Sequence, residues 1–296
     1  MIKQVNLSQI RTVLANNIES IHKKSKASKE IEHLNPLYAG GYPMSLLFAP
    51  RDKGALDEIN SLYYSDYDIY FTDEEKAQEA ISILSKISIA EAYVTENATT
   101  LRVKHPEHAE NKFEVFQIVH KVNGDAESIL PTFDFVNCAV GFAPLKNQFF
   151  LHKDAPLFHN ERILNILNPW MIKEALEEKK EINDNIIIQL LRFKKYCYRW
   201  GYNLSDSSFD LLIQAYEAYP NIVLSSNQVI RATGGSYSGQ EYYAWRNQNI
   251  WKSVARLMKS HSKWRDYKDT IGQIEAVDSH NENFRNIQPD ASQLPF

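Results

Sequence analysis

The chain has 296 residues, of which 44% are hydrophobic and 24% are charged, and its net charge is -4. This length can bury one large core or two ordinary ones. The chain has no apolar run of about 18 residues and no signal-peptide pattern at its start, so we expect a cytoplasmic protein without a membrane partner. Its mild acidity excludes a protein that coats nucleic acid through overall charge, and two cysteines are too few for a disulfide scaffold or a cysteine zinc site.

The first half of the chain alternates between helix and strand patterns. Residues 5–25 carry apolar positions at helical spacing, so residues 1–37 are predicted to form an N-terminal helix and a linker. A short apolar stretch then leads into Gly40 and Gly41, and a short helix is expected after them. Residues 63–71 read as a strand, and residues 72–87 as a helix with acidic residues in its first turn.

Further strand patterns follow, and then the pattern changes. Residues 90–104 predict a hairpin that turns near Asn97, residues 111–122 a strand, and residues 132–144 an apolar strand that carries Asp134 and pairs with residues 147–154. Beyond about residue 155 the chain is predicted to be helical almost throughout. The predicted organisation is an α+β protein with the following segments: an N-terminal segment 1–37, a catalytic domain 38–155, an all-helical region 156–275 and a loose tail 276–296.

Two features of the first half suggest phosphate chemistry. Asp66 and Asp68 stand one residue apart, and such a pair shares one face of a strand, so both carboxylates can meet one cation. The alternative is an exposed strand end or a turn. A glycine pair at a strand-to-helix turn lets backbone N–H groups approach a phosphate, and two nearby carboxylates can hold Mg²⁺. Ser45 and Tyr42, beside the glycines, are either phosphate contacts or ordinary residues of a helix start.

These motifs resemble the nucleotidyltransferase superfamily that includes DNA polymerase β, and within it the bacterial-type tRNA CCA-adding enzymes and poly(A) polymerases. "AGGYPMSLL" resembles the Gly-Gly phosphate turn, "SDYDIYF" the Asp-x-Asp metal motif and "FDFVNCAV" the sugar-contacting motif with Asp134. Residues 190–214 resemble the neck helix and turn of that family. The residues in register there are Arg192, Lys195, Tyr196, Arg199, Gly201 and Tyr202.

The resemblance implies a polymerase β-like palm with a mixed sheet and a Mg²⁺- or Mn²⁺-dependent transfer from a nucleoside triphosphate, ATP among them. Asp66 and Asp68 would hold the metal, and Gly40, Gly41 and Ser45 would bind phosphates. The third carboxylate would be Asp134 or Glu114. In the neck, Arg192 and Lys195 would contact the triphosphate or an acceptor, or else form the solvated side of a helix.

The identity of the acceptor is left open by the sequence. Met44 stands where tRNA-maturing members carry arginine, and the neck lacks their Glu-Asp-x-x-Arg segment. Residues 241–268 interleave aromatic and basic residues, which suits either an RNA acceptor or an amphipathic helix packed on a core. An RNA 3′ end, including that of a tRNA, is the first expectation. The alternatives are a protein acceptor and a catalytically inactive nucleic-acid-binding module.

Overall fold

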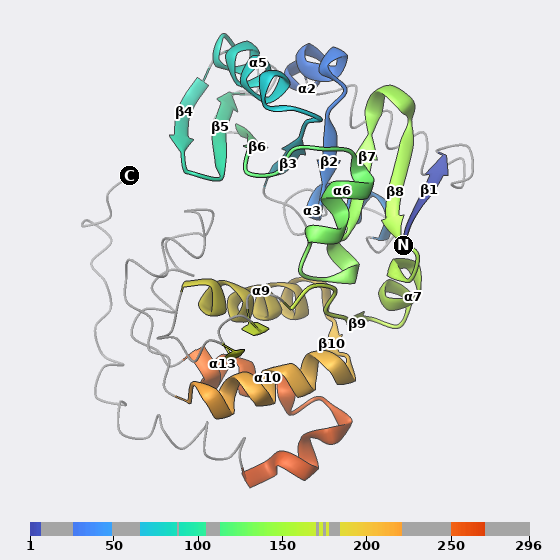
Figure 1. The fold of residues 1–296 in the computed structure, drawn as a ribbon, viewed down its shortest axis with the longest axis vertical. Helices are drawn as coiled ribbons and strands as arrows, with labels where there is room; N and C mark the ends of the chain where they lie inside the picture. Colours follow the sequence, from blue (N-terminus) through green and yellow to red (C-terminus); the bar gives the residue numbers. More distant parts are fainter. Residues whose placement is uncertain are drawn as a thin grey trace, which may run out of the picture. The chain divides into compact units, whose positions relative to one another are not determined.

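The computed structural model describes residues 1–6, 26–48, 66–87, 89–104, 113–169, 172–173, 176–177, 184–220 and 250–269 (Figure 1). The contacts within the chain divide it into two compact units, Met1–Glu161 and Arg162–Phe296. The first unit contains a large mixed sheet with helices, and the described part of the second is mostly helical, so the fold is α+β.

An eight-stranded sheet forms the centre of the first unit, in the order β1-β8-β7-β2-β3-β6-β5-β4. Strands β3 and β6 run parallel, and all other neighbours in this sheet are antiparallel. The strands are β1 (Ile2–Asn6), β2 (Leu37–Ala39), β3 (Tyr67–Tyr70), β4 (Ile89–Val94), β5 (Ala98–Lys104), β6 (Phe113–Val119), β7 (Val140–Ala143) and β8 (Gln148–His152).

One face of this sheet is the core of the first unit. Tyr38, Ile69, Phe116 and Phe142 are at most 1% exposed, and the strand register places them on the same face. The rings of Tyr38 and Tyr67 pack on Tyr42 from α3, with centroids 5.6 and 4.8 Å away. The helices of this unit are α2 (Lys26–Ile31), α3 (Gly41–Phe48), α5 (Glu74–Ser85), α6 (Ala126–Ile129) and α7 (Ala155–Asn160).

The helix α5 shows why local sequence signals succeed here. Asp73 precedes it in an extended conformation and its carboxylate accepts a hydrogen bond from the N–H of Lys76 at 2.9 Å, as an N-cap does. This bond, together with the side chains of Thr72 and Lys76, lowers the pKa of Asp73 to about 2. The buried residues Ala77, Ala80 and Leu84 recur at helical spacing.

Most predicted elements of the first unit are present. The short helix after the glycines is α3, the helix in residues 72–87 is α5, the hairpin is β4–β5, and β8 pairs with β7. Two predictions need correction. Residues 2–6 form an edge strand rather than entering a helix at residue 5, and Asp134 lies in a bend followed by the 3₁₀ turn Val136–Cys138, before strand β7. Residues 7–25, where the rest of the N-terminal helix was predicted, lie outside the described residues.

The second unit contains the helices α9 (Asp184–Trp200), α10 (Asp206–Ala218) and α13 (Ile250–Met258) and the 3₁₀ segment Ser262–Tyr267. The prediction of an all-helical region needs correction, because β9 (Ile163–Leu164) and β10 (Asn203–Leu204) form a short parallel pair. In the described ranges, every helix is too short or too polar to span a bilayer. The predicted tail 276–296 lies outside the described residues.

Candidate active site

The turn from β2 to α3 depends on Gly40. Its φ of +77° is a left-handed conformation that glycine adopts readily and other residues rarely do. Its N–H donates to the carbonyl of Val140 at 2.9 Å, and its carbonyl accepts from the N–H of Met44 at 3.1 Å. The Gly40 N–H is therefore used within the fold. The first backbone N–H groups of a helix have no carbonyl partner within that helix, and in α3 these groups begin at Gly41.

Asp68 lies directly beside this turn. In the register it pairs with Ala39, the residue before Gly40. A Cβ atom built on Gly40 would lie 3.4 Å from Oδ2 of Asp68 and 3.4 Å from Cε1 of Phe133. The structure therefore brings together the predicted phosphate turn and one predicted metal-binding carboxylate.

Asp66 precedes β3 in a bend, and both Asp66 and Asp68 are half-buried. The alternation of side chains along β3 places Tyr67 and Ile69 on the core face and Asp68 and Tyr70 on the opposite face. The face opposite the core therefore carries the Asp68 carboxylate. A substrate can contact Asp68 on that face.

The strand register places one of the two candidates for a third carboxylate, Glu114. Asp68 pairs with Gln117 of β6, so these two residues share a face. Glu114 is three positions from Gln117 on the same strand and therefore lies on the core face. It cannot join Asp68 in one metal site. Asp134, 5% exposed, belongs instead to the segment of Phe133, whose ring lies beside Gly40.

The segment from α6 to Cys138 covers part of the face that carries Asp68. A Cβ built on Gly141 would meet Leu130 at 3.6 Å and Leu37 at 2.9 Å, so Leu130 packs against β7 and β2 where Gly141 leaves room. The ring of Phe133 lies 6.1 Å from that of Tyr70. This packing sets the position of the chain at Asp134.

Ser45 has a role inside the helix. It is 3% exposed, and its hydroxyl donates to the carbonyl of Tyr42 at 2.7 Å. A hydroxyl can still accept a hydrogen bond, but its proton is used within α3. A phosphate contact from Ser45 would compete with this bond, which favours the backbone N–H groups as the phosphate donors.

The described acidic side chains do not form a complete metal site by themselves. Among the described residues, no three His, Cys, Asp or Glu side chains gather in a group that could hold a metal ion. Mg²⁺ in nucleotide enzymes is commonly held by one or two carboxylates, with phosphate oxygens and water as the other ligands. Asp66 and Asp68 supply that kind of donor set and do not supply an all-protein cage.

The two predicted neck residues lie in the second unit, on α9. Arg192 and Lys195 are half-buried, and their cationic groups lie 5.8 and 5.7 Å from the ring centre of Tyr196. Tyr196 itself is 6% exposed. The two cations therefore flank one buried tyrosine, at a distance typical of cation–π contacts.

The basic and aromatic residues near the C-terminus have structural partners. Trp251 is fully buried, and its indole N–H donates to the carbonyl of Tyr219 at 2.6 Å. Lys263 donates to both carboxylate oxygens of Asp210, at 3.0 and 3.1 Å. Trp251 packs inward, as the amphipathic-helix alternative predicts, whereas Lys263 forms an ion pair with Asp210. Residues 241–249 lie outside the described part.

One polar residue of this region was not predicted from the sequence. Gln117 is half-buried beside Asp68, and Thr100 of β5 pairs with Gln117. Asp68, Gln117 and Thr100 thus form a polar row across three strands. No local motif marks Gln117, because its position depends on the parallel pairing of β3 with β6.

Solved structures of known proteins share this fold. An apo CCA-adding enzyme superposes with a TM-score of 0.52 at 13% identity, covering 97% of this chain and 57% of that enzyme. CCA-adding enzyme complexes with CTP and ATP each give a TM-score of 0.51, at 14% and 12% identity. The CTP complex is matched over 86% of this chain and 53% of its own, and the ATP complex over 97% and 57%. The fold is that of nucleotidyltransferases of this kind.

A protein of Bacillus phage SPbetaL7, Gabija anti-defense 2, is 31% identical over 176 residues, which is 55% of this chain and 38% of that protein. The match therefore spans well under half of the relative's length. The model of the Gabija anti-defense 2 family matches residues 9–162, more than half of the chain. The chain therefore belongs to the Gabija anti-defense 2 family.

Proposed function

We propose that the protein is a metal-dependent nucleotidyltransferase that acts as an anti-defense protein by moving a nucleoside monophosphate from a triphosphate to an acceptor hydroxyl. The observation that supports this most strongly is the meeting of Gly40 and Asp68. A Cβ on Gly40 would lie 3.4 Å from Oδ2 of Asp68, so a phosphate at the turn would also be near the carboxylate. The fold shared with CCA-adding enzymes is consistent with it.

The residues divide the work as follows. The N–H groups that open α3 at Gly41 bind the β and γ phosphates, and the positive end of the helix dipole favours the same negative charge. Asp66 and Asp68 would hold Mg²⁺ or Mn²⁺. When bound, such an ion neutralises triphosphate charge and orients the acceptor hydroxyl. Asp134 serves the sugar or the attacking hydroxyl rather than the metal, since no three His, Cys, Asp or Glu side chains gather in a metal-binding group among the described residues.

In the transfer, the acceptor oxygen forms a bond to the α-phosphorus in line with the leaving group. The bond from that phosphorus to the bridging oxygen breaks, and pyrophosphate leaves. Asp134 takes the proton of the acceptor hydroxyl. The protein contributes mostly positioning and charge neutralisation, as is usual for phosphoryl chemistry.

An RNA 3′ end is the first acceptor to test. The neck residues Arg192 and Lys195 on α9 support it, as cations that can bind a phosphate backbone. A protein hydroxyl is the second candidate. The burial of Trp251, which removes one stacking surface for bases, favours this alternative.

The test incubates purified protein with Mg²⁺, each α-³²P-labelled nucleoside triphosphate in turn, total RNA and a bacterial protein extract. Label in RNA identifies a terminal transferase, and label in protein identifies a protein-modifying enzyme. Thermal shift with the same nucleotides shows binding without transfer, because a ligand of the native state raises its stability. Binding without label would indicate an inactive module.

The first prediction concerns the two carboxylates. We expect Asp66→Ala and Asp68→Ala each to lower transfer by at least about a thousandfold, since each removes a metal ligand. The fold should persist, because both residues are half-buried and Asp68 lies on the face away from the core. Circular dichroism spectra and rates of label transfer provide the comparison.

Glu79→Gln is the matched control, since it removes one exposed carboxylate from α5. Its transfer rate should equal that of the unmodified protein. Transfer that survives both aspartate substitutions would mean that the metal site lies elsewhere.

A further inference from the structure

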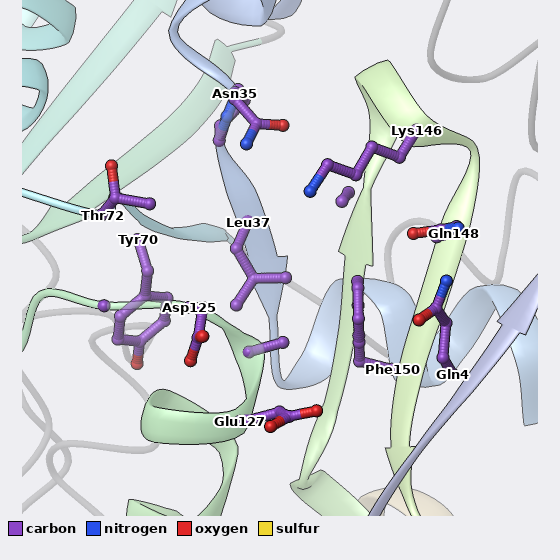
Figure 2. Close-up of a pocket in the computed structure, with 14 residues that line it drawn as sticks. Gln4, Asn35, Leu37, Tyr70, Thr72, Asp125, Glu127, Lys146, Gln148 and Phe150 are labelled. Carbon is purple, nitrogen blue, oxygen red and sulfur yellow. The ribbon is translucent and has the colours of Figure 1, made fainter.

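A pocket of about 480 Å³ opens on the sheet face of Asp68, further along the strands (Figure 2). Its floor includes Leu37 and Tyr70, which are the next residues on that face after Ala39 and Asp68. Neither Asp68 nor Gly40 lines the pocket. The volume is in the range of small-molecule sites, and the pocket is separate from the candidate active site.

Charges of opposite sign line different sides of this pocket. Lys146, in the turn between β7 and β8, extends its amine into the pocket, whereas Asp125 and Glu127 lie on the side of α6 (Figure 2). All three side chains are exposed. Lys146 and Glu127 form no ion pair with any described residue, so both charges are available to a ligand. Asp125 also caps α6, where its Oδ1 accepts from the N–H and hydroxyl of Ser128.

Amide groups lie between the charges. Gln4 of β1, Gln148 of β8 and Asn35 point into the pocket or along its rim (Figure 2). The Oδ1 atom of Asn35 is buried and has no hydrogen-bond partner among the described residues. A buried acceptor without a partner is costly, so a donor from a ligand or water is expected there. Side-chain amides can donate to and accept from peptide groups.

We propose that this pocket binds a short peptide with free ends, of two or three residues. The peptide carboxylate pairs with Lys146, its ammonium group pairs with Glu127, and the amides of the pocket bind its backbone. A nucleoside triphosphate fits poorly, because one cation faces two carboxylates and several negative phosphate charges would be repelled. Opposite charges on different walls favour a ligand whose own charges are separated.

The test uses the full chain and measures equilibrium binding of tri-alanine by calorimetry. N-acetyl tri-alanine, tri-alanine amide and free alanine are the comparison ligands. We expect tri-alanine to bind saturably and each blocked peptide to bind at least about tenfold more weakly, since each loses one charge-assisted contact. Equal binding of blocked and free peptides, or no saturable binding, would overturn the proposal.

Variants assign the binding to the pocket. Lys146→Gln and Glu127→Gln should each weaken tri-alanine about tenfold, whereas Lys86→Gln and Glu96→Gln remove equally exposed charges outside the pocket and should leave affinity unchanged. The Asp68→Ala variant should also bind normally, which separates this site from the active site. ATP that displaces tri-alanine competitively from the unmodified protein would contradict a peptide site.

Discussion

Two features of the position of Gly40 exclude a side chain there. A substituent there must tolerate a φ of +77°, and it must fit between Asp68 and Phe133 with 3.4 Å to each. We therefore expect Gly40→Ala to lower the free energy of unfolding by about 1–2 kcal/mol, because an L-residue in the left-handed region is strained. Urea denaturation gives the comparison.

Gly41→Ala is the matched control for this prediction. Gly41 is the first residue of α3, and its φ is not positive. Alanine should therefore be tolerated or slightly stabilising there. Equal destabilisation by both substitutions would show that the conformation of Gly40 is not the cause.

His159 packs against other residues of the first unit. Its ring stacks on Phe48 at 3.7 Å, and Nε2 lies 3.0 Å from the carbonyl of Asn137. Burial lowers the pKa of His159 to about 4, although the bond to Asn137 acts in the other direction. The imidazole is therefore neutral in the folded protein at neutral pH and can donate to that carbonyl.

The lowered pKa of His159 predicts a dependence of stability on pH. The unfolded chain takes up the proton near pH 6.5 and the folded chain only near pH 4, so stability falls as pH drops through this window. The loss reaches about 3 kcal/mol at the acid end. Urea denaturation at several pH values gives the free energy of unfolding of the first unit as a function of pH. This free energy should change less steeply with pH in His159→Phe, which keeps the stack on Phe48. An unchanged slope would assign the pH dependence to other groups.

At the scale of single elements, the sequence predicts best where the signal is local. The acidic first turn and the helical spacing after it predict α5, and the hairpin pattern that turns near Asn97 predicts β4–β5. The apolar run around Asp134 predicts a strand. Apolar runs do not distinguish a strand from buried 3₁₀ turns, and packing of Leu130 and Phe133 on the sheet decides in favour of the turns.

The residues of the candidate site also differ in whether a local sequence signal or a distant contact determines their placement. Gly40 and Asp68 belong to local motifs, and the sequence identifies both. The placement of Glu114 on the core face, away from Asp68, could not be predicted from a local motif. That placement follows from the pairing of β3 with β6, a contact between segments far apart in the chain.

In the second unit, an ion-pair cluster joins α10 to the 3₁₀ segment Ser262–Tyr267. Lys263 binds Asp210 and lies 3.4 Å from Asp206, and these contacts raise its pKa, the bond to Asp210 most. His261 stacks on Phe209 at 4.5 Å, and its Nε2 lies 3.2 Å from Asp206. The cluster therefore attaches the segment to α10 through two side chains.

We expect Lys263→Met to speed hydrogen exchange in residues 262–267, because two carboxylates lose their shared cation. Arg265→Met is the control, since Arg265 is exposed in the same segment and forms no ion pair with a described residue. Exchange measured by mass spectrometry resolves this peptide. Similar rates in the two variants would mean that ring packing alone holds the segment.

For the molecule as a whole, the first unit contains a complete structural core. All eight strands of the large sheet lie within Met1–Glu161, as do the pocket and the residues Gly40, Asp68 and Asp134. We therefore expect residues 1–161 alone to unfold cooperatively in urea and to retain tri-alanine binding. A gradual transition would show that the second unit is needed for a stable core.

The pairing of β1 with β8 also concerns synthesis of the chain. Ile2–Asn6 is synthesised before its partner Gln148–His152, and more than 100 residues lie between the two strands. During synthesis β1 therefore has no β8 to pair with until those residues have been made, and an unpaired strand edge favours aggregation. Slower translation of the residues between the two strands would lengthen this interval, so codon usage there can change how much of the protein aggregates.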